Sequence, residues 1–562
     1  MNTEFFGIIF TFLTTVALAI PFGKYIANTF AGKSSRLDKL LLPVEGTMYR
    51  IAGIDPNIEM NWKQQMKALL SINLLWLVLS VAILMNQHYL PLNPDNNPGM
   101  PADLAFNTAV SFVVNCNLQH YAGETGVSYL SQLWLMFLQF VSAATGMAAA
   151  VALFRAFRDK QVSTLGNFYQ YLIKSCTRIL LPLSFLLAII FMLRGMPMTF
   201  KGKDNVINMM GDSISVSRGP VAAFVPIKHL GTNGGGFFGA NSAHPLENPD
   251  YLTNMLELCA QMVIPIAMIF AFGFFIRRKK IAWMIFSVMT IGFVALVVPT
   301  VIAECQGNVA IAEMDIDMQD GAMEGKEMRF GAAASGFWSV ATTVISTGSV
   351  NAMHDSMMPL SGMNQILAMM VNAFYGGCGV GLLNFFVFII LGVFISGLMV
   401  GRTPEFMGKK VEAHEIKLAM MIALLHPFLI LLGTALAVAF PQQGAATLNN
   451  SSFHGFSEIL YEYTSAAANN GSGFEGLGDN NCWWNISTGI VLLLGRYLPI
   501  IGPIAIAGMM AQKKTVPHSS GTLPTDNATF GLMVFAVIAI VTALSFFPAL
   551  TLGPIAEFFT MK

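Results

Sequence analysis

Ten apolar stretches, each long enough to cross a lipid bilayer as a helix, constrain the fold of this chain most strongly. A membrane-spanning helix needs about 20 consecutive, mostly apolar residues. Only 11% of the residues are charged, which is far below the level of a soluble domain. The predicted spans are approximately 4–22, 66–86, 131–154, 170–193, 252–276, 281–303, 363–400, 415–438, 484–511 and 529–551. The sequence therefore predicts an all-α polytopic membrane protein with ten transmembrane helices.

Clusters of lysine and arginine predict the orientation of these spans. They follow the first, third, fifth, seventh and ninth spans, whereas the segments 86–154 and 441–484 contain neither residue type. Because loops rich in lysine and arginine stay on the cytoplasmic side, both termini are expected outside. The formal net charge is +0, so charge gives no reason to expect a nucleic-acid partner.

The inside loops are short, and they carry no motif for nucleotide hydrolysis. The longest, 23–65, is smaller than a typical folded domain. Neither a GxxxxGK(S/T) motif nor a DKTG phosphorylation motif occurs in the sequence. We therefore expect no catalytic residues in this chain and no ATP hydrolysis by it.

Four outside segments share one polar, glycine-containing design between paired spans. In each, an amphipathic stretch too short to cross leads into a loop rich in Gly, Asn, Thr and Ser, as in "GPVAAFVPIKHL" followed by "GTNGGGFFGAN". The loops recur at a nearly constant interval along the chain. Aligning them brings four triplets together: Asn115, Cys116 and Asn117; Thr232, Asn233 and Gly234; Ser346, Thr347 and Gly348; Asn469, Asn470 and Gly471.

This pattern predicts four repeats of span, re-entrant half-helix, polar loop and span. The repeats are placed at 66–154, 165–276, 281–400 and 415–511, with a first helix and cytoplasmic loop at 1–65 and a last helix at 529–551. Non-helical backbone at membrane depth is tolerated only where it is buried in protein or lines a water-filled path. We therefore expect the four loops to converge on one pseudo-fourfold, channel-like axis.

Converging loops of this composition predict a selectivity filter for potassium. Glycine allows successive carbonyl groups to point the same way, and stacked carbonyl rings can replace the hydration shell of K⁺. The C-terminal ends of the half-helices add negative partial charge. The triplets contain no Asp, Glu, Lys or Arg, which favours a large, weakly hydrated monovalent cation. "GTNGGG" alone fits a surface loop or a phosphate-binding nest, but four matched copies favour the filter.

Two residues near the first loop leave alternatives open. Asn117 stands where the other three triplets have glycine, so either its backbone is strained or that quadrant of the filter is wider. Gln119 lies two residues further on, and its amide could support the filter or contact an ion at the mouth. Both questions depend on backbone geometry.

The seventh span is too long for one simple crossing. The stretch 363–400 is nearly twice as long as one crossing requires, and the charge pattern allows only one. It contains "YGGCGVG" at 375–381, so Gly376 and Gly377 could form the linker of a broken helix that plugs the pore beneath the filter. Tilting or kinking of a continuous helix explains the length equally well. Arg402 follows and is expected to anchor the cytoplasmic end of this span.

The residues also resemble a known family at many points along the chain. The motifs are "EMNWKQ" (59–64), "HYLPLNP" (88–94), "LGTNGGGFF" (230–238), "HPLENP" (244–249), "AMHDS" (352–356), "GRTPE" (401–405), "HGFSE" (454–458) and "SSGTLPT" (519–525). They resemble the KdpA family, the potassium-binding subunits of Kdp potassium-transporting ATPases. The resemblance implies a potassium-transporter fold of four channel-like repeats, whose filter segments the four triplets match. It also implies that Gln119 matches the glutamine beside the first filter loop, and that Arg402 matches the cytoplasmic end of the broken helix.

Partners and cellular location follow from the same resemblance. It implies a complex in a bacterial cell (inner) membrane with a KdpB-like P-type ATPase subunit, a KdpC-like subunit and a small KdpF-like subunit, all in contact with membrane lipid. In such a complex K⁺ is captured from outside and passes through an intramembrane tunnel to the KdpB-like subunit, which hydrolyses ATP. The alternative is a stand-alone potassium channel or an ion-coupled potassium uptake transporter.

Overall fold

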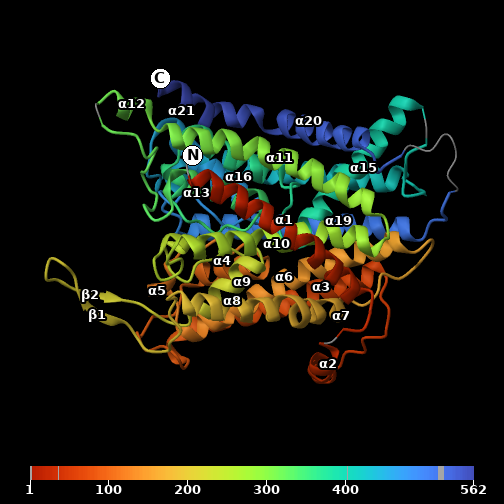
Figure 1. The fold of residues 1–562 in the computed structure, drawn as a ribbon, viewed down its shortest axis with the longest axis horizontal. Coiled ribbons are helices and arrows are strands. Elements are labelled where there is room, and N and C mark those ends of the chain that lie inside the picture. Colours follow the sequence, from red (N-terminus) through yellow and green to blue (C-terminus); the bar gives the residue numbers. More distant parts are fainter. Residues whose placement is uncertain (1–2, 36, 315, 402, 517–523, 562) are drawn as a thin grey trace.

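The chain forms a bundle of long helices that run side by side (Figure 1). The computed structural model describes residues 3–35, 37–314, 316–401, 403–516 and 524–561. Within these residues ten helices are long and apolar enough to cross a membrane, as the sequence predicts. They are α1 (Thr3–Phe30), α3 (Trp62–Asn86), α6 (Tyr129–Arg158), α7 and α8 (Phe168–Lys174 and Leu181–Leu193, joined as one span by the π-helical turn η2, Ser175–Leu180), α10 (Tyr251–Phe275), α11 (Lys279–Gln306), α15 (Val380–Val400), α16 (Ala413–Ala439), α19 (Cys482–Ala511) and α20 (Ala528–Leu552).

Two of the predicted spans differ from the observed helices by more than a few residues at their ends. α1 continues to Phe30, beyond the predicted end at residue 22, because Pro21 is accommodated inside the helix and does not end it. The predicted stretch 363–400 is two helices, since α14 (Pro359–Val371) ends well before α15 begins. The residues 372–379 between them are not helical, so this stretch is interrupted and is not one tilted helix.

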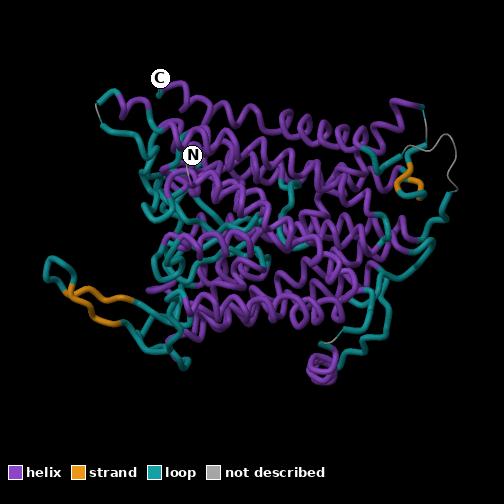
Figure 2. The backbone as a smooth tube through the Cα atoms, in the orientation of Figure 1, coloured by secondary structure: helices purple, strands orange, loops and turns teal. Residues whose placement is uncertain are grey.

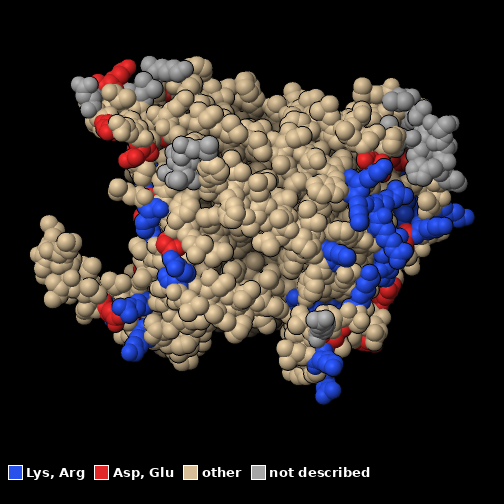
Figure 3. All heavy atoms as spheres, in the orientation of Figure 1, with Lys and Arg blue, Asp and Glu red and all other residues tan. Residues whose placement is uncertain are grey.

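The two ends of the bundle differ in charge. Lysines and arginines gather at the end that holds the loops after α1, α6, α10, α15 and α19 (Figure 3). The start of α1 and the short helix α21 (Pro554–Thr560) lie at the opposite end (Figure 1). At both ends of the bundle, helices begin at a side-chain cap. Four such caps are formed by residues that each accept a hydrogen bond from the backbone N–H three residues on: Asn61, Asp250, Asn481 and Asn527.

Four shorter helices enter the bundle without crossing it. They are α4 (Ala102–Val113), α9 (Val221–Leu230), α13 (Gly331–Ile345) and α18 (Ser452–Ala468). None is longer than 17 residues, and nearly all of their side chains are buried. Each ends within two residues of one of the triplets predicted from the sequence. Helices of this length bring the chain to the middle of the bundle, where it must turn back as loop.

The remaining elements of the described residues are short and lie toward the ends of the bundle. The helices are α2 (Asp38–Ala52), α5 (Gly123–Gly126), α12 (Val309–Ala312), α17 (Pro441–Gly444), η1 (Gln87–Tyr89), η3 (Asn241–Ala243) and η4 (His354–Ser356). Figure 2 shows strands in two hairpins. β1 (Asp204–Ile207) pairs antiparallel with β2 (Ser213–Val216), and β3 (Glu405–Phe406) pairs with β4 (Lys409–Lys410). Neither hairpin was expected from the sequence.

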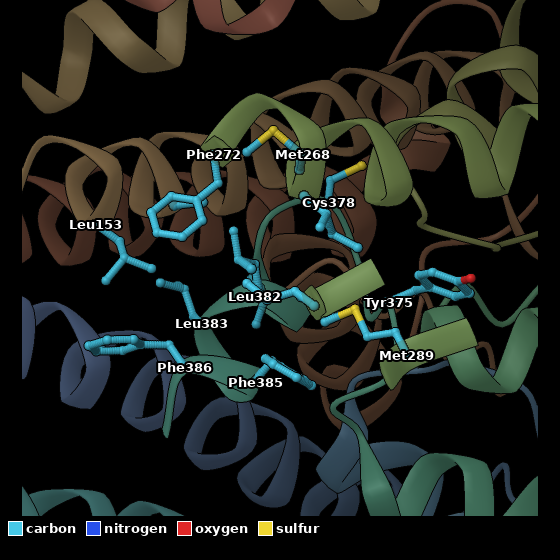
Figure 4. Close-up of a cluster of buried hydrophobic side chains, with 14 of the residues drawn as sticks. Leu153, Met268, Phe272, Met289, Tyr375, Cys378, Leu382, Leu383, Phe385 and Phe386 are labelled. Carbon is cyan, nitrogen blue, oxygen red and sulfur yellow. The ribbon is translucent and has the colours of Figure 1, made fainter. Parts of the chain in front are cut away.

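A buried apolar cluster surrounds the 372–379 interruption (Figure 4). Leu153 comes from α6, Phe272 from α10 and Phe386 from α15. Cys378 lies in the interruption and belongs to the same cluster. The non-helical segment is therefore held in place by packing against three neighbouring helices.

Candidate functional site

The four triplets meet in one layer of the bundle, each against the next. In three of them the third residue is a glycine that approaches the middle carbonyl of the following triplet so closely that a Cβ would overlap the oxygen. These pairs are Gly234 with Thr347, Gly348 with Asn470, and Gly471 with Cys116. The contacts run from the second triplet to the third, from the third to the fourth, and from the fourth back to the first. Together the triplets line up as a ring.

All four triplets share one unusual backbone conformation. The first and third residues have a positive φ, and the middle residue does not. The φ values are 66° and 60° for Asn115 and Asn117, 51° and 81° for Thr232 and Gly234, 56° and 84° for Ser346 and Gly348, and 51° and 105° for Asn469 and Gly471. Alternation of left- and right-handed residues turns successive carbonyl groups toward the same side of the chain. A filter built from carbonyl rings requires this arrangement.

Asn117 has the same backbone conformation as the glycines at its position. Its φ is 60°, and asparagine is among the few residues with a Cβ that adopt this region at low cost. The second loop makes space for the side chain, because a Cβ at Gly235 would lie only 2.7 Å from the Asn117 Cβ. Both amide atoms of Asn117 are buried and have no hydrogen-bond partner among the described residues. The first quadrant therefore keeps the ring geometry with an asparagine fitted against a neighbouring glycine.

Gln119 connects the first loop to the second through both atoms of its amide. Its Oε1 accepts a hydrogen bond from the Gly236 N–H at 2.7 Å, and its Nε2 donates to the Gly236 carbonyl at 3.1 Å. The Nε2 also donates to the Tyr121 hydroxyl at 3.1 Å. Because these bonds engage both ends of the amide, the geometry favours the supporting role over direct contact with an ion.

Three of the triplet asparagines, Asn115, Asn233 and Asn470, hold neighbouring repeats together through their side chains. Asn233 Nδ2 donates to Asn115 Oδ1 at 2.7 Å, and Asn115 Nδ2 donates to the Thr232 carbonyl at 3.0 Å. On the other side of the ring, Asn470 Nδ2 donates to the Thr342 carbonyl at 2.8 Å. These side chains are engaged in protein contacts, so the backbone carbonyls are the better candidates for cation ligands.

Charge near the ring comes from helix ends. The short helices α4, α9, α13 and α18 all end at the ring, so their C-terminal carbonyl groups place negative partial charge beside it. No triplet residue carries a formal charge. This combination attracts a cation without the strong, fixed field of a carboxylate.

The 372–379 interruption lies directly against the second loop. The backbone N–H of Cys378 donates to Thr232 Oγ1 at 3.0 Å, and a Cβ on Gly377 would lie 3.1 Å from the same oxygen. On its other side, Gly379 approaches the Gly146 carbonyl of α6, which a Cβ on Gly379 would meet at 2.5 Å. Gly376 has a φ of 61° and belongs to the same segment. Arg402, the third residue predicted for this region, lies outside the described residues.

Arg496 of α19 lies beside this interruption. Only 5% of the residue is exposed. A Cβ on Gly146 would lie 2.5 Å from the Cys378 carbonyl and 3.3 Å from Arg496 Nη2, so the two groups flank one glycine. This buried location beside the interruption argues against extension of the side chain to the membrane surface.

A cavity of about 440 Å³ opens above the ring, and its lining includes Gly348, Gly471, His120 and Asp479. His120 Nε2 lies 3.3 Å from Glu462 Oε1. Burial by itself lowers the pKa of His120. The neighbouring carboxylates of Asp479 and Glu462 outweigh this effect and raise the pKa to about 9. Burial raises the pKa of the Asp479 carboxyl to about 6, despite the opposing charge of His120. We call this cavity the mouth.

Sequence reasoning missed a charged group behind the ring. Lys228 lies in α9, and its side chain is completely buried. A lysine in "VAAFVPIKHL", an apolar segment at membrane depth, is itself the signal that could have found it, because ionisable residues there are costly and often functional.

Known proteins resemble this chain over nearly its whole length. Residues 9–559 match the family described as "KdpA: Potassium-transporting ATPase A subunit". Three bacterial proteins named "Potassium-transporting ATPase potassium-binding subunit" align with it. The protein from Flavobacterium johnsoniae is 65% identical and covers 100% of both chains, that from Phocaeicola vulgatus is 56% identical over 99% of both, and that from Geobacillus kaustophilus is 46% identical over 98% of both.

A solved structure shares the fold at low sequence identity. The crystal structure of the potassium transporter TrkH from Vibrio parahaemolyticus superposes with a TM-score of 0.53 at 12% identity. The match covers 89% of this chain and 98% of that one. The helical architecture is therefore shared well beyond the range of close sequence similarity. On its sequence matches, the chain belongs to the KdpA family, the A subunits of potassium-transporting ATPases.

Proposed function

We propose that this chain is the potassium-binding subunit of an ATP-driven potassium uptake complex, and that the ring of triplets is its selectivity filter. The observation that carries the proposal is the shared backbone conformation of the four triplets, with positive φ at the first and third positions of each. The names of the curated relatives support the same reading. The chain contributes ion capture, and ATP hydrolysis takes place on a partner.

Potassium fits the ring better than sodium or a divalent ion. Carbonyl oxygens replace the hydration shell of a large monovalent cation, whereas a divalent ion usually needs carboxylate ligands. The proposed ligands are the carbonyls of Asn115, Cys116 and Asn117; Thr232, Asn233 and Gly234; Ser346, Thr347 and Gly348; Asn469, Asn470 and Gly471. Potassium is thus the transported substrate, held in transit by backbone oxygens.

The interruption supports delivery to a partner over direct conduction. Its Cys378–Thr232 hydrogen bond closes the inner side of the ring, so Gly376 and Gly377 act as a gate. A small cavity of about 50 Å³ beside the interruption is lined by the polar residues Asn372, Asn384 and His426 among apolar neighbours. We place the start of a sideways intramembrane tunnel there.

Partners and orientation complete the proposal. The complex contains a KdpB-like P-type ATPase subunit, a KdpC-like subunit and a small KdpF-like subunit, with membrane lipid around them, in the inner membrane of a bacterium. The end of the bundle where lysines and arginines gather (Figure 3) is proposed to face the cytoplasm, which places both termini outside.

The test is the ATPase activity of the complex that co-purifies with this chain from native membranes. We expect hydrolysis to be stimulated by K⁺ and not by Na⁺, with the catalytic site on a partner. A pure chain that passes K⁺ in liposomes without any ATPase partner would instead identify a stand-alone channel or ion-coupled transporter.

A further inference from the structure

A buried lysine lies directly behind the second filter loop. Lys228 Nζ donates hydrogen bonds to Asn241 Oδ1 at 2.5 Å and to Ser242 Oγ at 2.8 Å. It also forms an ion pair with Glu247. The side chains of Lys228 and Glu247 are completely buried, so this is a charged pair shielded from solvent at filter depth.

Glu247 extends the contact to the backbone just after the second triplet. Its Oε2 accepts hydrogen bonds from the N–H groups of Phe237 at 3.2 Å and Phe238 at 3.3 Å. Lys228 also acts through its own carbonyl, which accepts from the N–H groups of Asn233 and Gly234 at 2.9 and 3.1 Å. One lysine thus contacts the second loop both within the triplet and beyond it.

Asn241 transmits this arrangement to a proposed ion ligand. Its Nδ2 donates to the Gly234 carbonyl at 2.8 Å, while its Oδ1 accepts from Lys228 Nζ and from the Ser242 N–H at 2.8 Å. With a cationic donor on the oxygen, the amide cannot flip, so the N–H always faces Gly234. The orientation of this carbonyl is therefore fixed by a chain of three residues that ends in a buried positive charge.

A buried ion pair is an expensive way to stabilise a protein, because desolvation can exceed the attraction between the charges. Such pairs are best explained where they specify one geometry. Resting on the proposed function, we propose that Lys228 is a positioning residue for ion selection: through Asn241 it fixes the Gly234 carbonyl at the distance that suits potassium. Glu247, through its ion pair with Lys228, keeps the lysine side chain directed toward Asn241.

The chain offers a matched comparison in a second buried lysine–glutamate pair. Lys326 Nζ lies 2.8 Å from Glu304 Oε2, and both side chains are completely buried. Glu304 Oε1 accepts from the Met358 N–H at 3.0 Å, and Lys326 Nζ donates to the Glu324 carbonyl at 3.2 Å. None of these described contacts reaches a triplet residue, so this pair serves as a structural control.

The experiment compares Lys228→Met, Asn241→Leu and the control Lys326→Met in the complete complex. Each is assayed for ATPase activity against K⁺, Rb⁺ and Na⁺, separating KM from kcat. We expect both filter-side variants to raise the KM for K⁺ by about tenfold and to reduce discrimination against Na⁺, with kcat at saturating K⁺ within about twofold. The control should leave the ratio of the ion KM values unchanged.

Loss of folding in Lys228→Met is handled by the double variant Lys228→Met with Glu247→Gln, which removes both charges of the ion pair together. Ion-dependent thermal stabilisation of the same preparations gives a readout independent of ATP hydrolysis. Folded filter-side variants with wild-type ion ratios in both assays would overturn the role of Lys228. If K⁺ neither stimulated ATP hydrolysis by the wild-type complex nor stabilised it thermally, the proposed function would be overturned as well.

Discussion

Three quadrants of the proposed filter ring end on glycine, and the first ends on Asn117, yet all four have the same backbone conformation. Gly234, Gly348 and Gly471 each make room for a carbonyl of the next loop by lacking a Cβ. At Asn117 the room is made by the neighbour, since Gly235 of the second loop lies against the asparagine side chain. The comparison teaches that the geometry of the ring is a property of the backbone, and that the glycine needed for close approach can stand on either side of a contact.

The largest effect is expected from Gly348→Ala. A Cβ there overlaps the Asn470 carbonyl, at a residue whose φ is 84°. Strain of this kind costs about 1–3 kcal/mol before the overlap is counted, so K⁺-stimulated ATPase activity should fall by at least about tenfold. Gly473→Ala is the matched control, because its Cβ would meet only a Glu462 oxygen at 3.5 Å. An unchanged KM for K⁺ in Gly348→Ala would remove the ring from the ion path.

Gly235→Ala should have the next largest effect, because it takes away the space that Asn117 occupies. We expect the KM for K⁺ to rise by about tenfold, and the double variant with Asn117→Gly to recover most of the loss, a coupling of about 1 kcal/mol. The double-mutant cycle is measured as KM values of the purified complex. Simple additivity of the two changes would show that the two residues do not share one space.

The first and fourth loops can also be compared at the mouth, where His120 follows the first loop and Asp479 follows the fourth. Burial raises the pKa of the Asp479 carboxyl to about 6, so it is charged above that pH and becomes neutral as the pH falls through it. His120, with a pKa of about 9, stays protonated over the same range. Apparent K⁺ affinity should therefore weaken by about threefold between about pH 7.5 and pH 5.5. Asp479→Asn should give the weaker affinity at both pH values, and a variant that keeps the full pH dependence would exclude this carboxylate.

Asn117→Gly alone should have the smallest effect. Glycine adopts a φ of 60° without strain, so the first quadrant should keep its shape and the KM should change by less than about threefold. Asn117→Ala should raise the KM for K⁺ more than Asn117→Gly does, because the left-handed conformation costs alanine free energy. The reverse order, measured in the same ATPase assay, would point to a side-chain role of Asn117 that the shared backbone conformation does not explain.

Much of the fold follows from local patterns in the sequence. Runs of apolar residues predict the ten spans, and the change from an apolar run to a Gly/Asn/Thr/Ser loop predicts α4, α9, α13 and α18 closely. The glycines of 375–381 predict a break, although they do not distinguish it from a kink. The lysine and arginine clusters also predict which loops lie at the same end of the bundle, because they follow every second span along the chain.

Other features depend on contacts that no local pattern contains. Whether Asn117 is strained depends on its φ and on the neighbouring Gly235, and neither can be inferred from the triplet alone. The bond from Asn241 to the Gly234 carbonyl needs a tight turn that returns the chain to the filter. The first span was predicted to end at residue 22, but α1 continues through Pro21 to Phe30, because a proline inside a membrane helix is tolerated.

The hydrogen bond between Cys378 and Thr232 also bears on how steep a concentration gradient the complex can hold. In the proposed orientation, an ion leaking back from the cytoplasm would meet this segment, beside the buried Arg496, before it reached the proposed filter. A pump stalls when the back-leak equals its turnover. Under the proposed function, the residual potassium concentration at which uptake stops would then depend on the tightness of a few backbone contacts under the ring as much as on the affinity of the ring itself.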